Sequence, residues 1–213
     1  MTYEPTELLT VYLGAWNERH KVGRLANRDR QILFEYDADF LASGIQISPI
    51  KLPLRSGVQI ADTAIFDGLF GVFNDSLPDG WGRLLLDRTV EKHGINRREL
   101  NPLDRLAYVG QYGMGALSYE PERGEHTSTK APLALDKLAE ESAIVLAGEN
   151  EEVFEELLRL NGSSSGARPK IVAQVSADKK RIIHGQQKLQ PGYAHWIIKF
   201  PSSQDPRDVG AIE

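Results

Sequence analysis

A glycine- and serine-rich segment lies between two apolar stretches in the last quarter of the sequence. It reads Asn-Gly-Ser-Ser-Ser-Gly-Ala-Arg-Pro-Lys over residues 161–170 and precedes an apolar run that predicts a strand, Ile171–Val175. The next predicted strand, His195–Pro201, carries a lysine near its end. Backbone N–H groups exposed by glycine, serine hydroxyls and a lysine on a following strand are groups that bind polyphosphate. The predicted phosphate-binding residues are Ser164, Ser165, Gly166, Ala167 and Lys199.

A simple connection between a helix and a strand is the alternative interpretation of this segment, because Gly/Ser loops commonly join elements. Lys199 would then be an ordinary surface lysine. Two phosphate-binding motifs, G-x-x-x-x-G-K-[ST] and a G-x-G-x-x-G that opens a helix, are absent from the sequence. A second glycine cluster, Gly110–Gly115, lacks a lysine, serines and a following helix, so it predicts a turn.

The composition is that of a soluble globular protein. The chain has 213 residues, of which 41% are hydrophobic and 26% charged, enough for one large or two small domains. A net charge of -5 argues against nonspecific nucleic-acid binding as the main activity. The absence of cysteine excludes disulfides and thiolate zinc sites. Because the sequence shows neither a signal peptide nor an apolar run of roughly 20 residues, no membrane association and a cytoplasmic location are expected.

Short apolar runs separated by polar turns predict an antiparallel meander in the first part of the chain. Strands are expected at Leu8–Ala15, Lys21–Ala26 and Ile32–Tyr36, with short edge pieces at Ile45–Ile47 and Ile50–Leu54.

Helical periodicity follows the meander. Apolar residues at i, i+3, i+4 and i+7 predict a helix over Ile65–Asn74 whose apolar face lies in the core. These residues are Phe66, Leu69, Phe70 and Phe73. Two further helices and a closing strand are expected at Trp81–His93, Pro102–Val109 and Ala116–Tyr119.

A polar stretch without periodicity, Glu120–Pro132, predicts a linker. The chain therefore divides into residues 1–120, a linker at 121–134, and a second domain at 135–213. Helices are expected at Leu133–Leu146 and Glu151–Leu160, and a short strand at Arg181–His184, between the two named above. This pattern predicts the α+β class.

The segments Ser163–Lys170 and His195–Pro201 resemble the start of the kinase core in HipA-family proteins, the serine/threonine-kinase toxins of bacterial toxin–antitoxin modules. The front half of the chain is similar to the same family, in the same order. The similar segments are Val11–Gly14, Val22–Leu25, Phe34–Asp37, Leu52–Leu54, Phe73–Gly80 with Arg83, Tyr108–Gly110 and Gly115–Leu117. The resemblance implies a HipA-like N-terminal subdomain of antiparallel strands with helices, followed by the start of a protein-kinase-like N-lobe.

The resemblance also implies a function and partners. The complete kinase would use ATP and Mg²⁺ to phosphorylate a protein, in the family an aminoacyl-tRNA synthetase, which arrests growth and underlies persistence. A helix-turn-helix antitoxin of the HipB kind, which also carries operator DNA, would neutralise it. Lys199 would contact the ATP phosphates, and Glu213 is placed to orient it. Ser163 matches the serine whose autophosphorylation ejects the loop, although a turn-capping serine is the alternative.

The family's catalytic loop and metal-binding aspartate lie in a C-terminal lobe that nothing in this sequence matches. No catalytic or metal-binding residue is therefore predicted, and the chain is expected to be the N-terminal part of such a kinase, unable to phosphorylate a protein unaided. Two other interpretations stay open. One is a non-enzymatic partner or inhibitor of a separate HipA-like kinase, and the other is an unrelated nucleotide-binding protein.

Overall fold

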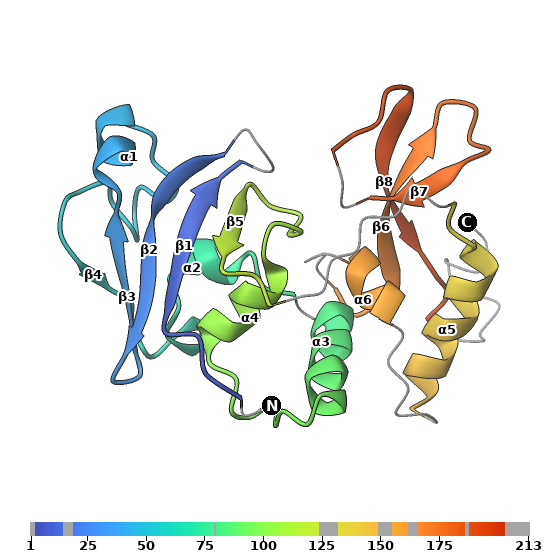
Figure 1. Cartoon of the computed structure of the whole chain (residues 1–213), viewed down its shortest axis with the longest axis horizontal. Helices are drawn as coiled ribbons and strands as arrows, with labels where there is room; N and C mark the ends of the chain where they lie inside the picture. The colour runs from blue at the N-terminus through green and yellow to red at the C-terminus, as the bar shows by residue number, and fades with distance from the viewer. Residues whose placement is uncertain are drawn as a thin grey trace. The chain divides into compact units, whose positions relative to one another are not determined.

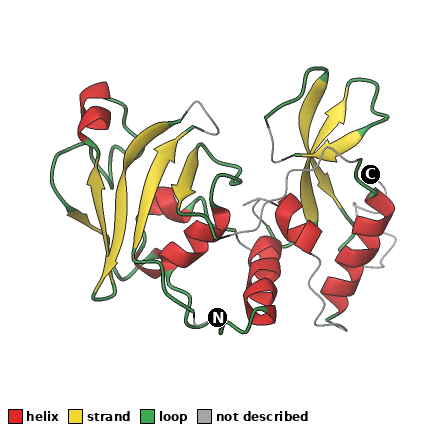
Figure 2. Cartoon of the chain, in the orientation of Figure 1, coloured by secondary structure: helices red, strands yellow, loops and turns green. Residues whose placement is uncertain are grey.

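The computed structural model describes residues 3–14, 19–78, 80–123, 132–148, 155–161, 166–185 and 188–202. The chain forms two compact units, each built from two separate stretches of sequence. The first unit comprises Met1–Leu77 and Arg98–Gly124, and the second comprises Pro78–Arg97 and Glu125–Glu213 (Figure 1). Helices and strands occur in both units, and the sheets are antiparallel (Figure 2). The predicted α+β class is confirmed.

The first unit is built on a five-stranded antiparallel sheet in the order β4-β3-β2-β1-β5. Its strands are β1 (Leu8–Leu13), β2 (His20–Arg28), β3 (Gln31–Tyr36), β4 (Gln59–Ile60) and β5 (Leu117–Glu120). Strands were expected at four of these places, and the structure confirms them. Asp29 and Arg30 join β2 to β3 with φ of 51° and 62°, as a two-residue hairpin turn with both central residues left-handed requires.

The predicted edge pieces at Ile45–Ile47 and Ile50–Leu54 are wrong. The strand at the β3 edge of the sheet is instead β4, which pairs Ile60 with Leu33 and Gln59 with Phe34. The structure describes all of residues 45–54 and gives them one isolated bridge, between Ser48 and Leu52. The prolines at positions 49 and 53 explain this, because proline has no N–H for a strand ladder.

A short helix, α1 (Ala38–Ser43), follows β3, where none was expected. The Asp37 carboxylate caps it by accepting a hydrogen bond from the Asp39 N–H at 3.2 Å. Gly44 ends the helix with φ of 71°. The Asp and Gly at its two ends were therefore the signals that identify it.

The helix predicted over Ile65–Asn74 is also wrong as a continuous element. The chain makes a 3₁₀ turn, η1 (Phe66–Gly68), and then a short helix, α2 (Gly71–Asn74). Phe66 and Asp67 have φ of 54° and 53°, and two left-handed residues in succession interrupt a right-handed helix. Leu69, Phe70 and Phe73 are buried as the spacing predicted, whereas Phe66 is 49% exposed.

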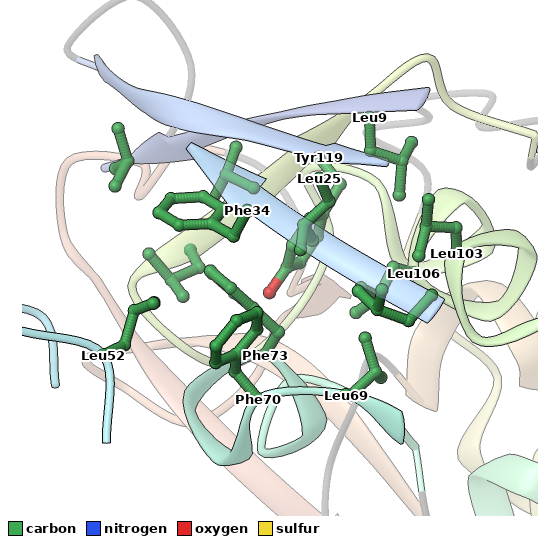
Figure 3. Close-up of a cluster of buried hydrophobic side chains, with 14 of the residues drawn as sticks. Leu9, Leu25, Phe34, Leu52, Leu69, Phe70, Phe73, Leu103, Leu106 and Tyr119 are labelled. Atoms are coloured by element: carbon green, nitrogen blue, oxygen red, sulfur yellow. The ribbon is translucent and has the colours of Figure 1, made fainter. Parts of the chain in front are cut away.

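The core of the first unit lies between the sheet and the helices that follow it (Figure 3). The Phe34 ring is central, with its centroid 4.9 Å from that of Tyr36 and 5.0 Å from that of Phe73. Tyr119 of β5 is fully buried and its hydroxyl donates to Ser76 Oγ at 2.7 Å. The predicted helix at Pro102–Val109 is confirmed as α4, which begins with a capping box between Asn101 and Asp104.

The first unit should lose stability at alkaline pH through Tyr36. This side chain is 4% exposed, its hydroxyl donates to the Leu52 carbonyl at 2.8 Å, and burial raises its pKa from 10.0 to about 12. The folded state therefore keeps a proton that the unfolded state releases. Its stabilising contribution is complete below pH 10 and falls, by a few kcal/mol, as the pH rises to about 12.

Urea unfolding measured at pH 9 and pH 12 checks this expectation. Tyr36→Phe should lose less free energy of unfolding between these pH values than the wild type does. The same pH dependence in both proteins would show that Tyr36 does not carry the effect.

The second unit packs helices against one face of a small antiparallel sheet. The helices are α3 (Gly80–Lys92), α5 (Leu135–Ala147) and α6 (Glu155–Asn161), and the strands are β6 (Lys170–Ser176), β7 (Ile182–His184) and β8 (Tyr193–Lys199). The strand order is β7-β6-β8. Helices and strands were expected at all six places, with boundaries shifted by a few residues.

Residues 124–131 of the predicted linker lie outside the described residues, and the predicted domain boundaries stay a prediction. The segment Pro78–Arg97, which contains α3, belongs to the second unit in space, although it precedes the predicted linker in sequence. Within the stretches of chain that the structure describes, no helix combines the length and the apolar character that a membrane span needs.

Candidate phosphate-binding site

The two faces of the second unit's sheet differ in character. The register of β6 and β8 sets Ile171 opposite Ile198 and Lys170 opposite Lys199. Ile171 and Ile198 belong to the apolar cluster that includes Trp81 of α3. Because side chains alternate between faces along a strand, the two lysines lie together on the other face, at the end of β6 that follows the glycine loop.

Lys170 connects this face to the end of the loop. It is 4% exposed, and its Nζ donates to the Gly166 carbonyl at 2.9 Å. Gly166 has φ of 102°, and a Cβ at this position would lie 3.3 Å from Lys170 Nζ. A residue with a side chain would therefore be strained here and would crowd the ammonium group, so glycine leaves room beside the lysine.

The residues that follow the loop are fixed against the end of β8. Arg168 Nε donates to the Phe200 carbonyl at 3.0 Å, and the Phe200 N–H donates to the Pro169 carbonyl at 2.9 Å. This pair of bonds brings Arg168, Lys170 and Lys199 to one end of the sheet.

Two cationic side chains meet at this end of the sheet. Like charges directly opposite one another on a sheet are destabilising, and Lys170 and Lys199 are such a pair. A multiply charged anion bound between the two ammonium groups would turn this repulsion into two charge-assisted contacts.

Gln174 lies on the same face of the sheet, is fully buried, and hydrogen-bonds to the backbone of Lys188 and Gln190, in the segment before β8. Its Oε1 accepts from the Gln190 N–H at 2.8 Å and its Nε2 donates to the Lys188 carbonyl at 3.3 Å. The Gln174 amide therefore fixes this segment over the face that also carries the two lysines.

The structure brings together some of the residues predicted from sequence. Gly166 and Ala167 lie at the described end of the loop, and Lys199 faces the lysine that contacts Gly166. The predicted Ser163, Ser164, Ser165 and Glu213 lie outside the described residues.

Sequence reasoning missed Lys170 as a site residue. The available signal was its place as the first residue of the strand that follows the loop. It also missed Gly80 and Trp81 of α3, which contact the end of the loop. A glycine at the start of a predicted helix was the sequence feature that pointed to them.

The donor set fits the polyphosphate of a nucleotide rather than a metal. Ammonium groups and the backbone beside a glycine bind phosphate oxygens. No group of three or more His, Cys, Asp or Glu side chains able to hold a metal ion occurs in the part of the chain that the structure describes. The described residues therefore supply donors of the kind that a polyphosphate needs.

Comparison with known proteins identifies the front of the chain. A family model described as the HipA N-terminal domain matches residues 13–120, just over half of the chain. No curated protein matches the chain. The match runs from the end of β1 to the end of β5 and includes α3. The chain therefore belongs to the HipA family and carries that family's N-terminal domain.

Proposed function

We propose that this chain is the N-terminal part of a HipA-like serine/threonine-protein kinase toxin, and that its second unit holds the phosphates of ATP. The observation that carries the proposal is the register of β6 and β8, which sets Lys170 opposite Lys199 beside Gly166. When bound with Mg²⁺, ATP supplies the phosphoryl group that such a kinase transfers. The residues of this chain bind and orient the phosphates.

Each residue of the proposed site has a defined task. Lys199 is exposed at the end of an edge strand, so its side chain is accessible to a ligand from solvent. Lys170 is anchored through Gly166 and adds a second positive charge at a fixed place. Gly166 and Ala167 are the proposed backbone contacts to the phosphates, by analogy with the glycine-rich loops of kinases.

Family membership supports the remaining parts of the proposal. Ser163 is the proposed autophosphorylation site, where a dianionic phosphate would repel a bound nucleotide. The proposed partners are a helix-turn-helix antitoxin, operator DNA through that antitoxin, and a protein substrate of the aminoacyl-tRNA synthetase kind.

Binding of MgATP, followed by NMR chemical shifts of the backbone amides, tests the proposed site and detects even millimolar affinity. We expect shifts at Gly166–Lys170 and at the end of β8. Lys199→Met should raise the Kd roughly 10- to 100-fold, the size of one missing charge-assisted contact.

Lys180→Met is the matched control for the Lys199 variant. It removes the same charge from an exposed turn after the other end of β6, and its Kd should equal that of the wild type. Equal Kd values for the two variants, or shifts confined to other residues, would contradict the proposed site.

A non-enzymatic partner or inhibitor of a separate HipA-like kinase is the second candidate. The observation in its favour is that the family match covers the N-terminal domain, residues 13–120, and not the second half of the chain. Absence of amide shifts with millimolar MgATP, together with a stable complex with such a kinase in gel filtration, would favour this candidate.

A further inference from the structure

The start of α3 touches the end of the glycine loop, backbone against backbone. The Trp81 N–H donates to the Gly166 carbonyl at 3.1 Å. Gly80 has φ of 44°, and a Cβ on it would lie 2.7 Å from Ala167 Cα and from the carbonyl carbon and oxygen of Gly166. No side chain fits at such distances, so glycine at position 80 permits the contact.

The Gly166 carbonyl is held from two sides. It accepts from the Trp81 N–H at 3.1 Å and from Lys170 Nζ at 2.9 Å. A carbonyl oxygen has two lone pairs, and these two donors use both. Because the peptide is planar, fixing this oxygen also fixes the orientation of the Gly166–Ala167 peptide and places the Lys170 ammonium beside it.

We infer that Gly80 and Trp81 form a clip that positions Gly166 and Ala167 at the end of the glycine loop, and that both are positioning residues for nucleotide binding. The inference rests on the proposed function for its nucleotide part. A loop end that is already fixed loses less conformational freedom when a ligand binds, which raises affinity. The clip lies within the matched N-terminal domain, yet it groups with the second unit. The N-terminal domain thus contributes a part of the proposed ATP site.

A pair of glycine variants on the same helix tests the clip. Gly80→Ala adds a methyl group that collides with Gly166 and Ala167. Gly94→Ala, just after the other end of α3, is the control, because Gly94 has φ of 74° and a Cβ added to it would meet nothing within 4 Å. Both variants place an alanine in the left-handed region and are strained by it. Only Gly80→Ala also introduces a steric clash, so the difference between the two variants reports on the clash.

Amide hydrogen exchange of the nucleotide-free full chain is the first measurement. We expect exchange at residues 166–170 to rise roughly tenfold in Gly80→Ala and to stay at the wild-type rate in Gly94→Ala. Lys170→Met, which removes the other donor to the Gly166 carbonyl without changing α3, should also raise it. If circular dichroism shows that Gly80→Ala is unfolded, the Trp81 amide of the wild type decides the question. As a donor to the Gly166 carbonyl, it should exchange as slowly as amides in the interior of α3, and rapid exchange of this amide would overturn the clip.

MgATP titration of the same variants is the second measurement. Gly80→Ala should raise the Kd at least several-fold over Gly94→Ala. Equal exchange rates in the two glycine variants, or tighter nucleotide binding by Gly80→Ala, would overturn the clip. Absence of MgATP binding by the wild type would overturn the proposed function and the nucleotide role with it, whereas the exchange difference would still support the contact.

Discussion

Replacing Asp104 with asparagine should lower the free energy of unfolding of the first unit by about 3–5 kcal/mol. Asp104 is fully buried at the start of α4, and its carboxylate accepts from the Thr6 N–H at 2.7 Å and the Asn101 N–H at 2.8 Å. It also accepts from the Tyr3 hydroxyl and lies 3.6 Å from Arg123. An amide NH₂ in place of one oxygen would face N–H or O–H donors instead of accepting from them.

The position of Asp104 in the chain explains the size of this effect. Its partners come from the N-terminal segment before β1, from the cap of α4 and from the segment after β5. Burial, and then the Asp104 carboxylate itself, raise the pKa of Tyr3, so the Tyr3 hydroxyl keeps its proton as a donor. The carboxylate thus joins the N-terminal segment to two segments that follow it much later in the sequence, and its removal releases all of them.

Urea unfolding of the full chain, with hydrogen exchange of β2 amides to report on the first unit, measures the loss. Asp62→Asn is the matched control, because Asp62 is exposed and its carboxylate accepts from the Ala64 N–H at 2.9 Å. That variant should stay within about 0.5 kcal/mol of the wild type. Similar losses in both variants would mean that the buried network adds nothing beyond an ordinary surface carboxylate.

The parts of the fold that were predictable from sequence are those decided by local pattern. Strands β1, β2 and β3 have apolar runs of the right length, and Asn101 followed by Pro102 is a typical helix start. The stripe at Leu69, Phe70 and Phe73 identified core residues correctly even though the continuous helix was wrong. The spacing of apolar residues predicts which side chains face the core. It does not reveal the left-handed backbone of Phe66 and Asp67, which interrupts the helix.

The candidate site shows the same division between local and long-range information. The glycine loop and Lys199 stand out by residue type. Lys170 becomes significant only when the pairing of β6 and β8 sets it opposite Lys199, and register follows from strand packing. The contact of Gly80 with Ala167 joins residues far apart in sequence, and no local pattern predicts such a contact.

Removing both lysines should nearly abolish nucleotide binding while leaving the nucleotide-free protein no less stable. Lys199→Met removes one of two like charges in cross-strand register, so the free energy of unfolding without ligand should rise by about 0.2–1 kcal/mol. Lys170→Met should change the free energy of unfolding little, because two effects oppose each other. The variant loses the hydrogen bond to the Gly166 carbonyl, but it also avoids the cost of burying a charged group. Because the double variant can make neither charge-assisted contact with the phosphates, its Kd for MgATP should rise roughly 100-fold or more.

Thermal or urea unfolding with and without MgATP measures both effects in one experiment. At a ligand concentration of about 100 Kd, the wild type should gain about 2.7 kcal/mol, and a 100-fold weaker variant at the same concentration only about 0.4 kcal/mol. A pure stability defect would lower the free energy of unfolding with and without ligand by the same amount. Opposite signs under the two conditions are the result expected if the lysines repel each other until an anion binds between them. A double variant that keeps the full gain of about 2.7 kcal/mol would show that the nucleotide binds elsewhere.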